Sequence, residues 1–153
     1  MADFIKAHTE TLKIEGGYAN DKDDNGGETW KGIARKFHSS WLGWRIVDKV
    51  KKANPGADAD RLNELLTGDK ELERLELAFY KTEFWDIIKG DQIEDQQTAA
   101  MIYDSAVNIG YKPAIRMAQN TAFGISNEAD AKAIGIDYGR MDKLTLDKLN
   151  NAA

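Results

Sequence analysis

The sequence contains no cysteine, which excludes disulfide bonds and thiolate metal sites. It also lacks any apolar run approaching the roughly 20 residues that a helix needs to cross a bilayer, so we expect no membrane insertion. The N-terminal residues Met1 to Lys6 lack the basic start and the apolar core of a signal peptide. We therefore expect a protein that is made in the cytoplasm and leaves it only by release or by dedicated export.

Positive charge is also in short supply. The chain carries 21 basic and 26 acidic side chains, a net charge of −5. A nucleic-acid partner would favour a basic face, so none is expected. The 153 residues correspond to one domain or two very small ones, and folding at this size buries roughly 68–70% of the unfolded surface. The remaining composition is that of an ordinary globular protein.

Helical periodicity dominates what is present. The patterns and helix-ending residues predict a mainly α fold, with helices near residues 4–15, 30–44, 58–66, 69–84, 95–109, 113–123, 128–134 and 144–149. Pro113 suits the first position of its helix. β-structure is expected to be at most a short hairpin near residues 17–30. A break in the pattern at residues 89–92 predicts a boundary, giving regions 1–90 and 91–153.

Glu15 is the first candidate for chemistry. Phe4, Ile5, His8 and Leu12 form an apolar stripe that places Glu15 at the core-facing end of its helix, where Gly16 and Gly17 end it. Burial and the negative end of the helix dipole would both raise the carboxyl pKa, as a general acid requires. The alternative is a glutamate that simply faces water. We expect His8 to be a core histidine with a satisfied hydrogen bond.

The segment that follows, residues 20–29, holds no apolar side chain and is predicted to be a loop. It offers Asp21, Asp23, Asp24 and Glu28 as a second carboxylate, which glycosidases pair with their acid. Thr29 can orient a water molecule by hydrogen bonding. A solvated loop with no chemical task is the alternative.

A calcium loop is a competing interpretation of this segment. Asp21, Asp23, Asn25 and Gly26 match the first half of an EF-hand loop. The twelfth position should be a bidentate glutamate, but here it is Gly32. We therefore expect no metal and no other cofactor.

Several separated blocks resemble the glycoside hydrolase family 108 muramidases, earlier described as secretion-activator proteins. The blocks occur in the family's order and cover nearly the whole chain except about residues 34–70. They are Glu15-Gly16-Gly17-Tyr18, Asn20-Asp21, Asp24, Gly26-Gly27-Glu28-Thr29, Gly32-Ile33, Phe79-Tyr80-Lys81, Phe84-Trp85-Asp86, Asp104-Ser105-Ala106-Val107-Asn108-Ile109-Gly110, Gln119-Asn120 and residues 137–149.

The resemblance implies a lysozyme-like helical fold and cleavage of the β-1,4 bond between N-acetylmuramic acid and N-acetylglucosamine. Its partner would be the glycan strands of peptidoglycan, so the protein would act on the cell wall. The family's catalytic acid falls on Glu15. Phage-type lysozymes place an aspartate nine positions later, which is Asp24, and Thr29 takes the third role. Region 1–90 would then be catalytic, and region 91–153 would bind peptidoglycan.

Candidate substrate contacts are more open. Tyr18 either lines the cleft or packs under the loop, and Trp30 either stacks on a sugar ring or belongs to the core. Glu28 is a further candidate. Asp104 and Asn108 share one helix face and would contact glycan or stem peptide, or Asn108 would brace the turn after the helix.

Two rival functions fit the same residues. A lytic transglycosylase also uses a single glutamate but leaves a 1,6-anhydro sugar. A non-catalytic module would bind peptidoglycan or calcium without producing new reducing ends.

Overall fold

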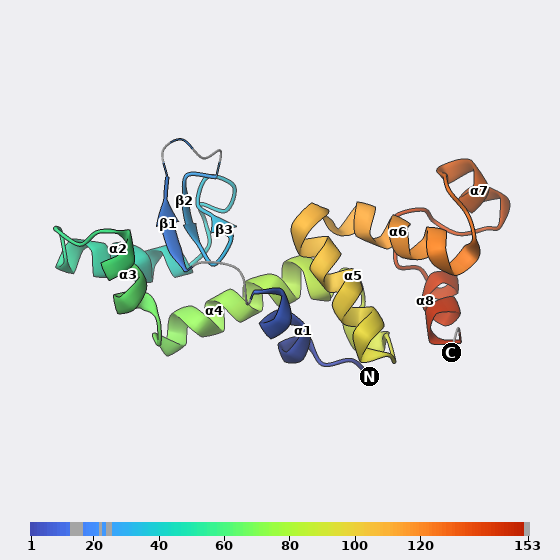
Figure 1. Ribbon diagram of the computed structural model, residues 1–153, viewed down its shortest axis with the longest axis horizontal. Coiled ribbons are helices and arrows are strands. Elements are labelled where there is room, and N and C mark those ends of the chain that lie inside the picture. The colour runs from blue at the N-terminus through green and yellow to red at the C-terminus, as the bar shows by residue number, and fades with distance from the viewer. Residues whose placement is uncertain (13–16, 22, 24–25, 152–153) are drawn as a thin grey trace. The chain divides into compact units, whose positions relative to one another are not determined.

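The computed structural model describes residues 1–12, 17–21, 23 and 26–151 (Figure 1). Within them the fold is mainly α and lysozyme-like, as predicted. The helices are α1 Phe4–Thr11, α2 Gly43–Ala53, α3 Ala59–Leu66, α4 Lys70–Tyr80, α5 Gln96–Ile109, α6 Tyr111–Phe123, α7 Glu128–Ala133 and α8 Lys143–Asn150. A π-helical turn, Lys81–Trp85, continues α4, and a 3-10 turn spans Gly90–Gln92.

The chain packs as two compact units. One unit, called the helical unit below, combines Met1–Lys13 with Tyr80–Ala153. The other, the sheet unit, is Ile14–Phe79. This grouping follows packing and differs from the division at residue 90, which concerns function and stays a prediction.

Acidic and amide side chains begin most of the helices. Each of these N-cap side chains accepts a hydrogen bond from a backbone N–H in the first turn, which satisfies a donor that the helix itself leaves unpaired. The capping residues are Asp3, Asp58, Asp95, Asn127 and Asp142. These caps explain why the helices near residues 58–66, 95–109, 128–134 and 144–149 lie where the sequence predicts them.

An aromatic cluster forms the core of the helical unit. Phe4 stacks on His8 with ring centroids 5.3 Å apart, and both rings pack against Tyr103 of α5. Trp85 contacts Phe4 and Tyr103 and is fully buried. His8 Nδ1 and the Tyr103 hydroxyl are hydrogen-bonded at 2.7 Å. His8 is therefore the satisfied core histidine that its position predicts.

The stripe prediction for α1 is only partly right. Phe4, Ala7 and His8 are buried, but Ile5 is 51% exposed because it lies about 100° around the helix from Phe4, at the edge of the buried face. Pro113 is the third rather than the first residue of α6, still within the turn where its missing N–H costs no helical bond. Among the described residues, no helix is long and apolar enough to cross a membrane.

The sheet unit contains the predicted hairpin and one further strand. Strand β1, Tyr18–Asn20, pairs antiparallel with β2, Glu28–Trp30, which pairs with β3, Ile33–Ala34. Tyr18 lies opposite Trp30, and Asn20 lies opposite Glu28. The β1–β2 connection is therefore the acidic loop that carries Asp24.

The helix predicted over residues 30–44 is wrong. Trp30 and Ile33 are partners across a two-residue turn rather than neighbours on a helix. Lys31 and Gly32 form this turn with φ of 43° and 83°, and a turn with positive φ at both positions matches the twist of a tight hairpin. The helix in this region is α2, which starts later, and Phe37 is 67% exposed.

Candidate active site

The two carboxylates predicted to be catalytic, Glu15 and Asp24, lie outside the described residues. The structure does describe the strands that flank the acidic loop and the last turn of α1. Thr29 sits in the middle of β2, opposite Ala19 of β1 and Ala34 of β3. It is half-buried, in the central strand of the sheet.

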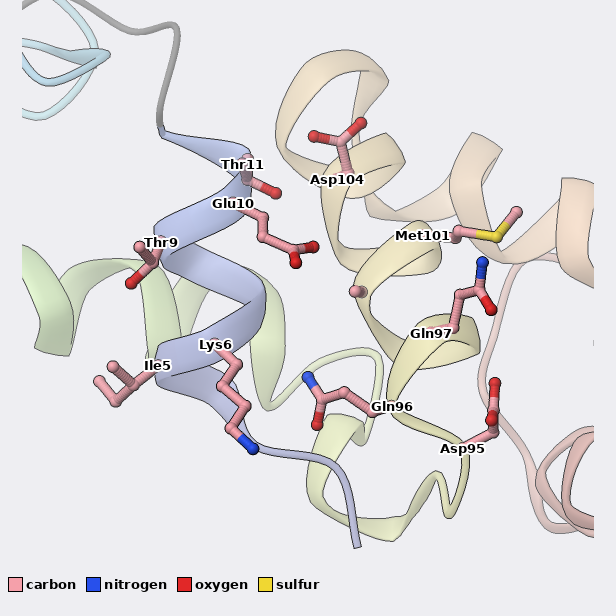
Figure 2. A pocket seen from close by; sticks show the side chains of 11 residues that line it. Ile5, Lys6, Thr9, Glu10, Thr11, Asp95, Gln96, Gln97, Met101 and Asp104 are labelled. Carbon is pink, nitrogen blue, oxygen red and sulfur yellow. The ribbon is translucent and has the colours of Figure 1, made fainter.

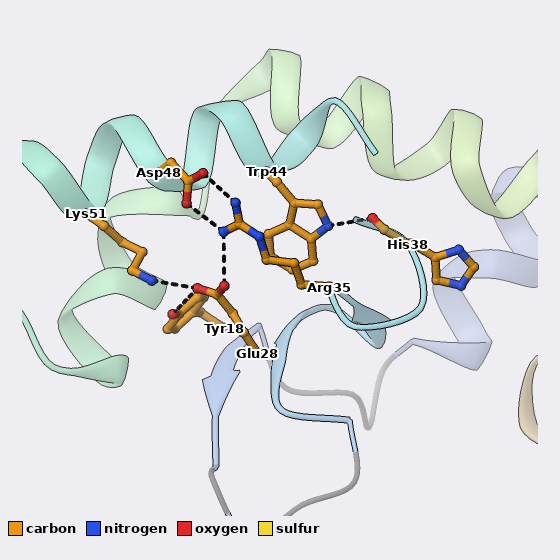
Figure 3. A network of polar contacts seen from close by, with 7 residues as sticks. All are labelled: Tyr18, Glu28, Arg35, His38, Trp44, Asp48 and Lys51. Carbon is orange, nitrogen blue, oxygen red and sulfur yellow. Dashed lines mark hydrogen bonds and ion pairs between the residues drawn. The ribbon is translucent and has the colours of Figure 1, made fainter. Parts of the chain in front are cut away.

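Glu28 is the centre of a charged network at the base of this loop (Figure 3). Its Oε2 accepts a hydrogen bond from the Tyr18 hydroxyl at 2.6 Å and from Lys51 Nζ at 2.8 Å. Its Oε1 accepts from Arg35 Nη1 at 3.1 Å. The Glu28 side chain is only 12% exposed, so these three donors replace most of its hydration.

The network holds Glu28 ionised. Burial alone raises the pKa of its carboxyl group, but the hydrogen bonds outweigh burial, and the pKa lies below its ordinary value. Burial raises the pKa of the Tyr18 phenol, and the hydrogen bond to Glu28 adds to that rise. The hydrogen bond to Glu28 raises the pKa of Lys51. A carboxylate in this state is a poor proton donor, and both of its oxygens are engaged within the protein.

Arg35 extends the network to α2. Its two terminal nitrogens bind the Asp48 carboxylate in a bidentate pair, both at 2.6 Å. Its guanidinium group also lies 5.2 Å from the ring centre of Trp44, whose indole N–H donates to the backbone oxygen of His38. The hydrogen bond from Arg35 lowers the pKa of Asp48. The network thus connects α2 to the segment after β3 and to β1 and β2, the two strands that flank the acidic loop.

Tyr18 and Trp30 face the interior of the sheet unit. Tyr18 is 8% exposed and Trp30 is 3% exposed. Trp30 is placed as the core alternative expects, with its ring packed rather than presented to a sugar. Tyr18 is likewise packed, and its hydroxyl is bonded to Glu28. Their assignment as substrate contacts stays a prediction.

Gly17 makes room for a protein side chain. A Cβ atom at this position would lie 1.6 Å from Asn63 Oδ1, so any side chain here would displace Asn63 of α3. The same Asn63 oxygen accepts a hydrogen bond from the Tyr18 backbone N–H at 3.1 Å. The small size of Gly17 therefore serves the packing of β1 against α3.

A groove of about 1000 Å³ runs between α1 and residues 95–104, at the start and middle of α5, in the helical unit (Figure 2). Glu10, Thr11 and Asp104 line the end nearer the C-terminus of α1, and Lys6 and Gln96 line the other end. The lining is rich in carboxylate, amide and hydroxyl groups. Such groups can donate and accept hydrogen bonds with a polar ligand.

Asp104 and Asn108 have different surroundings on the exposed face of α5. Asp104 lines the groove. Asn108 Nδ2 donates to the backbone oxygen of Asp104 at 2.9 Å, one helical turn earlier. This bond lies within the last turns of α5, whereas the structural alternative predicted for Asn108 is to brace the turn at Gly110 after the helix.

The described part of the loop contains a local turn, in which the Asp23 backbone N–H donates to Asp21 Oδ1 at 2.9 Å. Within the described ranges, no group of three or more His, Cys, Asp or Glu side chains is placed to hold a metal ion.

Sequence reasoning missed Arg35, Asp48 and Lys51. Asp48 and Lys51 are three residues apart on α2, a helix that the apolar pattern did not predict. Their spacing places Asp48 and Lys51 on one face of a helix. This spacing is the one sequence feature that could have indicated that they act together. Nothing in the sequence indicates that this face meets Glu28.

Comparison with known proteins agrees with this architecture. No protein of curated function matches the sequence. The solved structure of SagA from Brucella abortus matches with a TM-score of 0.57 and 24% identity, over 98% of this chain and 70% of that chain, which shows a shared fold. The family model described as Glycosyl hydrolase 108 matches residues 8–110. Because that match covers more than half of the sequence and includes the sheet, the acidic loop and the groove-lining α5, the chain belongs to glycosyl hydrolase family 108.

Proposed function

We propose that this glycosyl hydrolase is an N-acetylmuramidase. It cleaves the β-1,4 bond between N-acetylmuramic acid and N-acetylglucosamine in peptidoglycan, and it acts on the cell wall after release or dedicated export. The observation that carries the proposal is the family match over residues 8–110. That range contains the Glu15-Gly16-Gly17-Tyr18 segment and the loop after it.

Glu15 is the general acid in this mechanism. It protonates the glycosidic oxygen while the sugar passes through an oxocarbenium-like state. Asp24, assisted by Thr29, positions the attacking water or stabilises the developing positive charge. The order along the chain supports these roles, because Glu15 comes four positions after the last residue of α1, which ends earlier than the predicted helix 4–15, and Asp24 lies in sequence between the paired strands β1 and β2.

The described residues support the second role through Glu28. A loop that positions a carboxylate benefits from a fixed base. Tyr18 and Glu28 stand on the two strands that enclose the loop and are joined by a 2.6 Å hydrogen bond. Glu28 is itself ion-paired to Lys51 and Arg35. In this proposal, the Glu28 carboxylate orders the loop, and Asp24 takes part in the chemistry.

The groove between α1 and α5 supports a glycan-binding role for Asp104. Its polar lining begins within the last turn of α1, four residues before Glu15 in the sequence. Asn108 would contact substrate through its amide oxygen, since its amide nitrogen is used by the helix. Residues 91–153 are proposed to bind peptidoglycan.

The deciding experiment compares the wild type with Glu15→Gln in a peptidoglycan zymogram. Glu15→Gln should lose wall clearing by more than about a hundredfold, the typical contribution of a general acid. The matched control is Glu73→Gln, which alters an exposed glutamate of α4 and should clear the wall like the wild type. A fully active Glu15→Gln protein would overturn the assignment.

The products separate the muramidase from its rivals. Borohydride reduction followed by mass spectrometry should find muropeptides that end in reducible N-acetylmuramic acid. Products ending in 1,6-anhydro sugars would indicate a lytic transglycosylase. Binding to peptidoglycan without new reducing ends would indicate a non-catalytic module.

A further inference from the structure

A second pocket, of about 430 Å³, lies in the helical unit away from the α1–α5 groove. It is formed by α6, by residues 137–141 between α7 and α8, and by Lys89 before the 3-10 turn. None of these residues takes part in the proposed hydrolysis. Their arrangement indicates a binding site of its own.

Buried hydrogen bonds fix the 137–141 wall of this pocket. Gln119 of α6 is fully buried, and its Nε2 donates to the backbone oxygens of Asp137 and Arg140, both at 3.0 Å. Its Oε1 accepts from the Gly139 N–H at 2.8 Å. The neighbouring Asn120 accepts a hydrogen bond from the Tyr138 hydroxyl at 2.8 Å. The segment is therefore held in one conformation before any ligand arrives, which lowers the entropic cost of binding.

Arg116 lines the pocket, and its guanidinium group has hydrogen-bond donors that no described residue uses. Its Nε is buried and, among the described residues, has no hydrogen-bond partner. Its guanidinium carbon lies 5.0 Å from the ring centre of Tyr138, a cation–π contact that orients the planar group. Among the described residues, the terminal nitrogens of Arg116 also make no hydrogen bond or ion pair, so they are the donors that an anion in the pocket would contact, and the covered Nε–H would respond through the same guanidinium group.

Gly139 allows this close packing. A Cβ atom at position 139 would lie 3.0 Å from Arg116 Nε, and the residue has a φ of +87° that favours glycine. Lys89, also in the lining, is a non-glycine residue with a φ of 54°.

The charge of the lining is opposite to that of the whole chain. Lys89, Lys112, Arg116 and Arg140 supply four positive charges among the described lining residues, and Asp137 supplies one negative charge. Asp137 is paired weakly with Arg140, at 3.7 Å. Outside the lining, the Asp142 carboxylate interacts electrostatically with Lys89 and accepts hydrogen bonds from the backbone N–H groups of Asp137 and Thr145. A local excess of three positive charges remains in a protein whose net charge is −5.

We propose that this pocket binds an oxyanion, a carboxylate or a phosphate group, with Arg116 as the main contact and Lys89 and Lys112 as supporting charges. The planar guanidinium group matches the geometry of both anions, and its fixed orientation over Tyr138 favours such a contact over a diffuse attraction.

In a cell wall this group has two sources, the carboxylates of peptidoglycan stem peptides and the phosphates of phosphodiester polymers. This choice of sources rests on the proposed function, whereas the anion site itself does not.

The test is a titration of the full chain, labelled with 15N, with sodium phosphate and separately with sodium acetate. Sodium chloride keeps the ionic strength constant. The Arg116 Nε–H and Gly139 N–H resonances should shift in a saturable way. A soluble muropeptide with free stem carboxylates and a glycerol-phosphate oligomer then distinguish the two sources. Saturation by either supports the proposal and names the source.

Variants make the assignment specific. Arg116→Gln should weaken the apparent affinity by about tenfold or more, the effect of losing one charge-assisted contact. Lys112→Gln, at an exposed position that does not threaten folding, should weaken it several-fold. Arg45→Gln, on the exposed face of α2, is the matched control and should bind like the wild type. Non-saturable shifts, or equal affinity in all three variants, would overturn the proposal.

Catalysis and anion binding are measured independently. Glu15→Gln should keep the anion-dependent shifts while it loses wall clearing. A chain that clears the wall but does not bind either anion contradicts the pocket alone. A chain that binds anions but never cleaves peptidoglycan contradicts the proposed function alone.

Discussion

Replacing Glu28 with glutamine tests whether the charged network stabilises the sheet unit. The substitution keeps the size of the side chain and one acceptor oxygen, but it removes the negative charge that Lys51, Arg35 and Tyr18 share. Hydrogen bonds to charged groups contribute about 1.5–3 kcal/mol each. The Lys51 and Arg35 side chains are 36% and 34% exposed, so solvent screens both ion pairs. The contribution of each pair to stability is therefore closer to that of a surface ion pair, at most about 1 kcal/mol. We therefore expect a loss of about 2–3 kcal/mol in the free energy of unfolding.

The stabilisation by Glu28 should also depend on pH, in a direction set by the shift of its pKa. The pKa of Glu28 is lower in the folded protein than its ordinary value, because the hydrogen bonds outweigh the opposing effect of burial. Its stabilising contribution is therefore fully present above the unfolded pKa of about 4.3 and is lost as the pH falls through the folded pKa. The stability difference between wild type and Glu28→Gln should be largest near neutral pH and should shrink in acid.

Urea unfolding followed by tryptophan fluorescence measures both effects, because Trp30 and Trp44 lie in the same unit. Glu64→Gln is the matched control. That glutamate is 68% exposed and, among the described residues, pairs only with the exposed Arg61, so its loss should change stability by less than about 0.5 kcal/mol. An effect of Glu28→Gln as small as the control's, or one that persists unchanged in acid, would refute the reasoning.

Four further substitutions, at three positions, probe other contacts by the same unfolding assay. Tyr18→Phe removes only the hydroxyl bonded to Glu28 and should cost about 0.5–1.5 kcal/mol, and no loss would mean that this bond adds nothing to stability. Gln119→Leu removes the bonds that hold residues 137–141 and leaves their backbone groups unpaired. It should cost more than about 3 kcal/mol, and a loss below about 1 kcal/mol would contradict the preorganised wall. Trp30→Ala should cost about 3–5 kcal/mol because it leaves a cavity in the core. Trp30→Phe should cost much less, since the buried indole N–H has no partner among the described residues. Equal losses from the two substitutions would contradict this account.

The fold was predictable where local chemistry decides it. Asp58 and Asp95 precede apolar repeats and cap α3 and α5, and Gly110 ends α5, so these helices follow from neighbouring residues alone. The failure at residues 30–44 is also local. The spacing of Trp30 and Ile33 fits both a helical turn and a pair across a tight hairpin, and the pattern alone does not separate them.

The site was predictable only in part because its polar contacts are distant in sequence. Lys51 meets Glu28 across 23 positions, and Arg35 meets Asp48 across 13. No periodicity indicates which charged face of a helix will pair with which strand. Motif order assigned roles to Glu15 and Asp24, and those roles remain predictions for the activity assay.

The capping aspartates restrict how the charge of this protein can be altered. A redesign that makes the chain more basic, to improve its approach to an anionic wall polymer, would begin by replacing acidic residues. Asp3, Asp58, Asp95 and Asp142 each hold a helix N-terminus, where replacement costs about 1 kcal/mol. Substitutions are safer at exposed acids that make no such bond, such as Glu73. Part of the negative charge is therefore needed for helix stability. Only the remaining acidic residues can be replaced to adapt the charge of the protein to an anionic substrate.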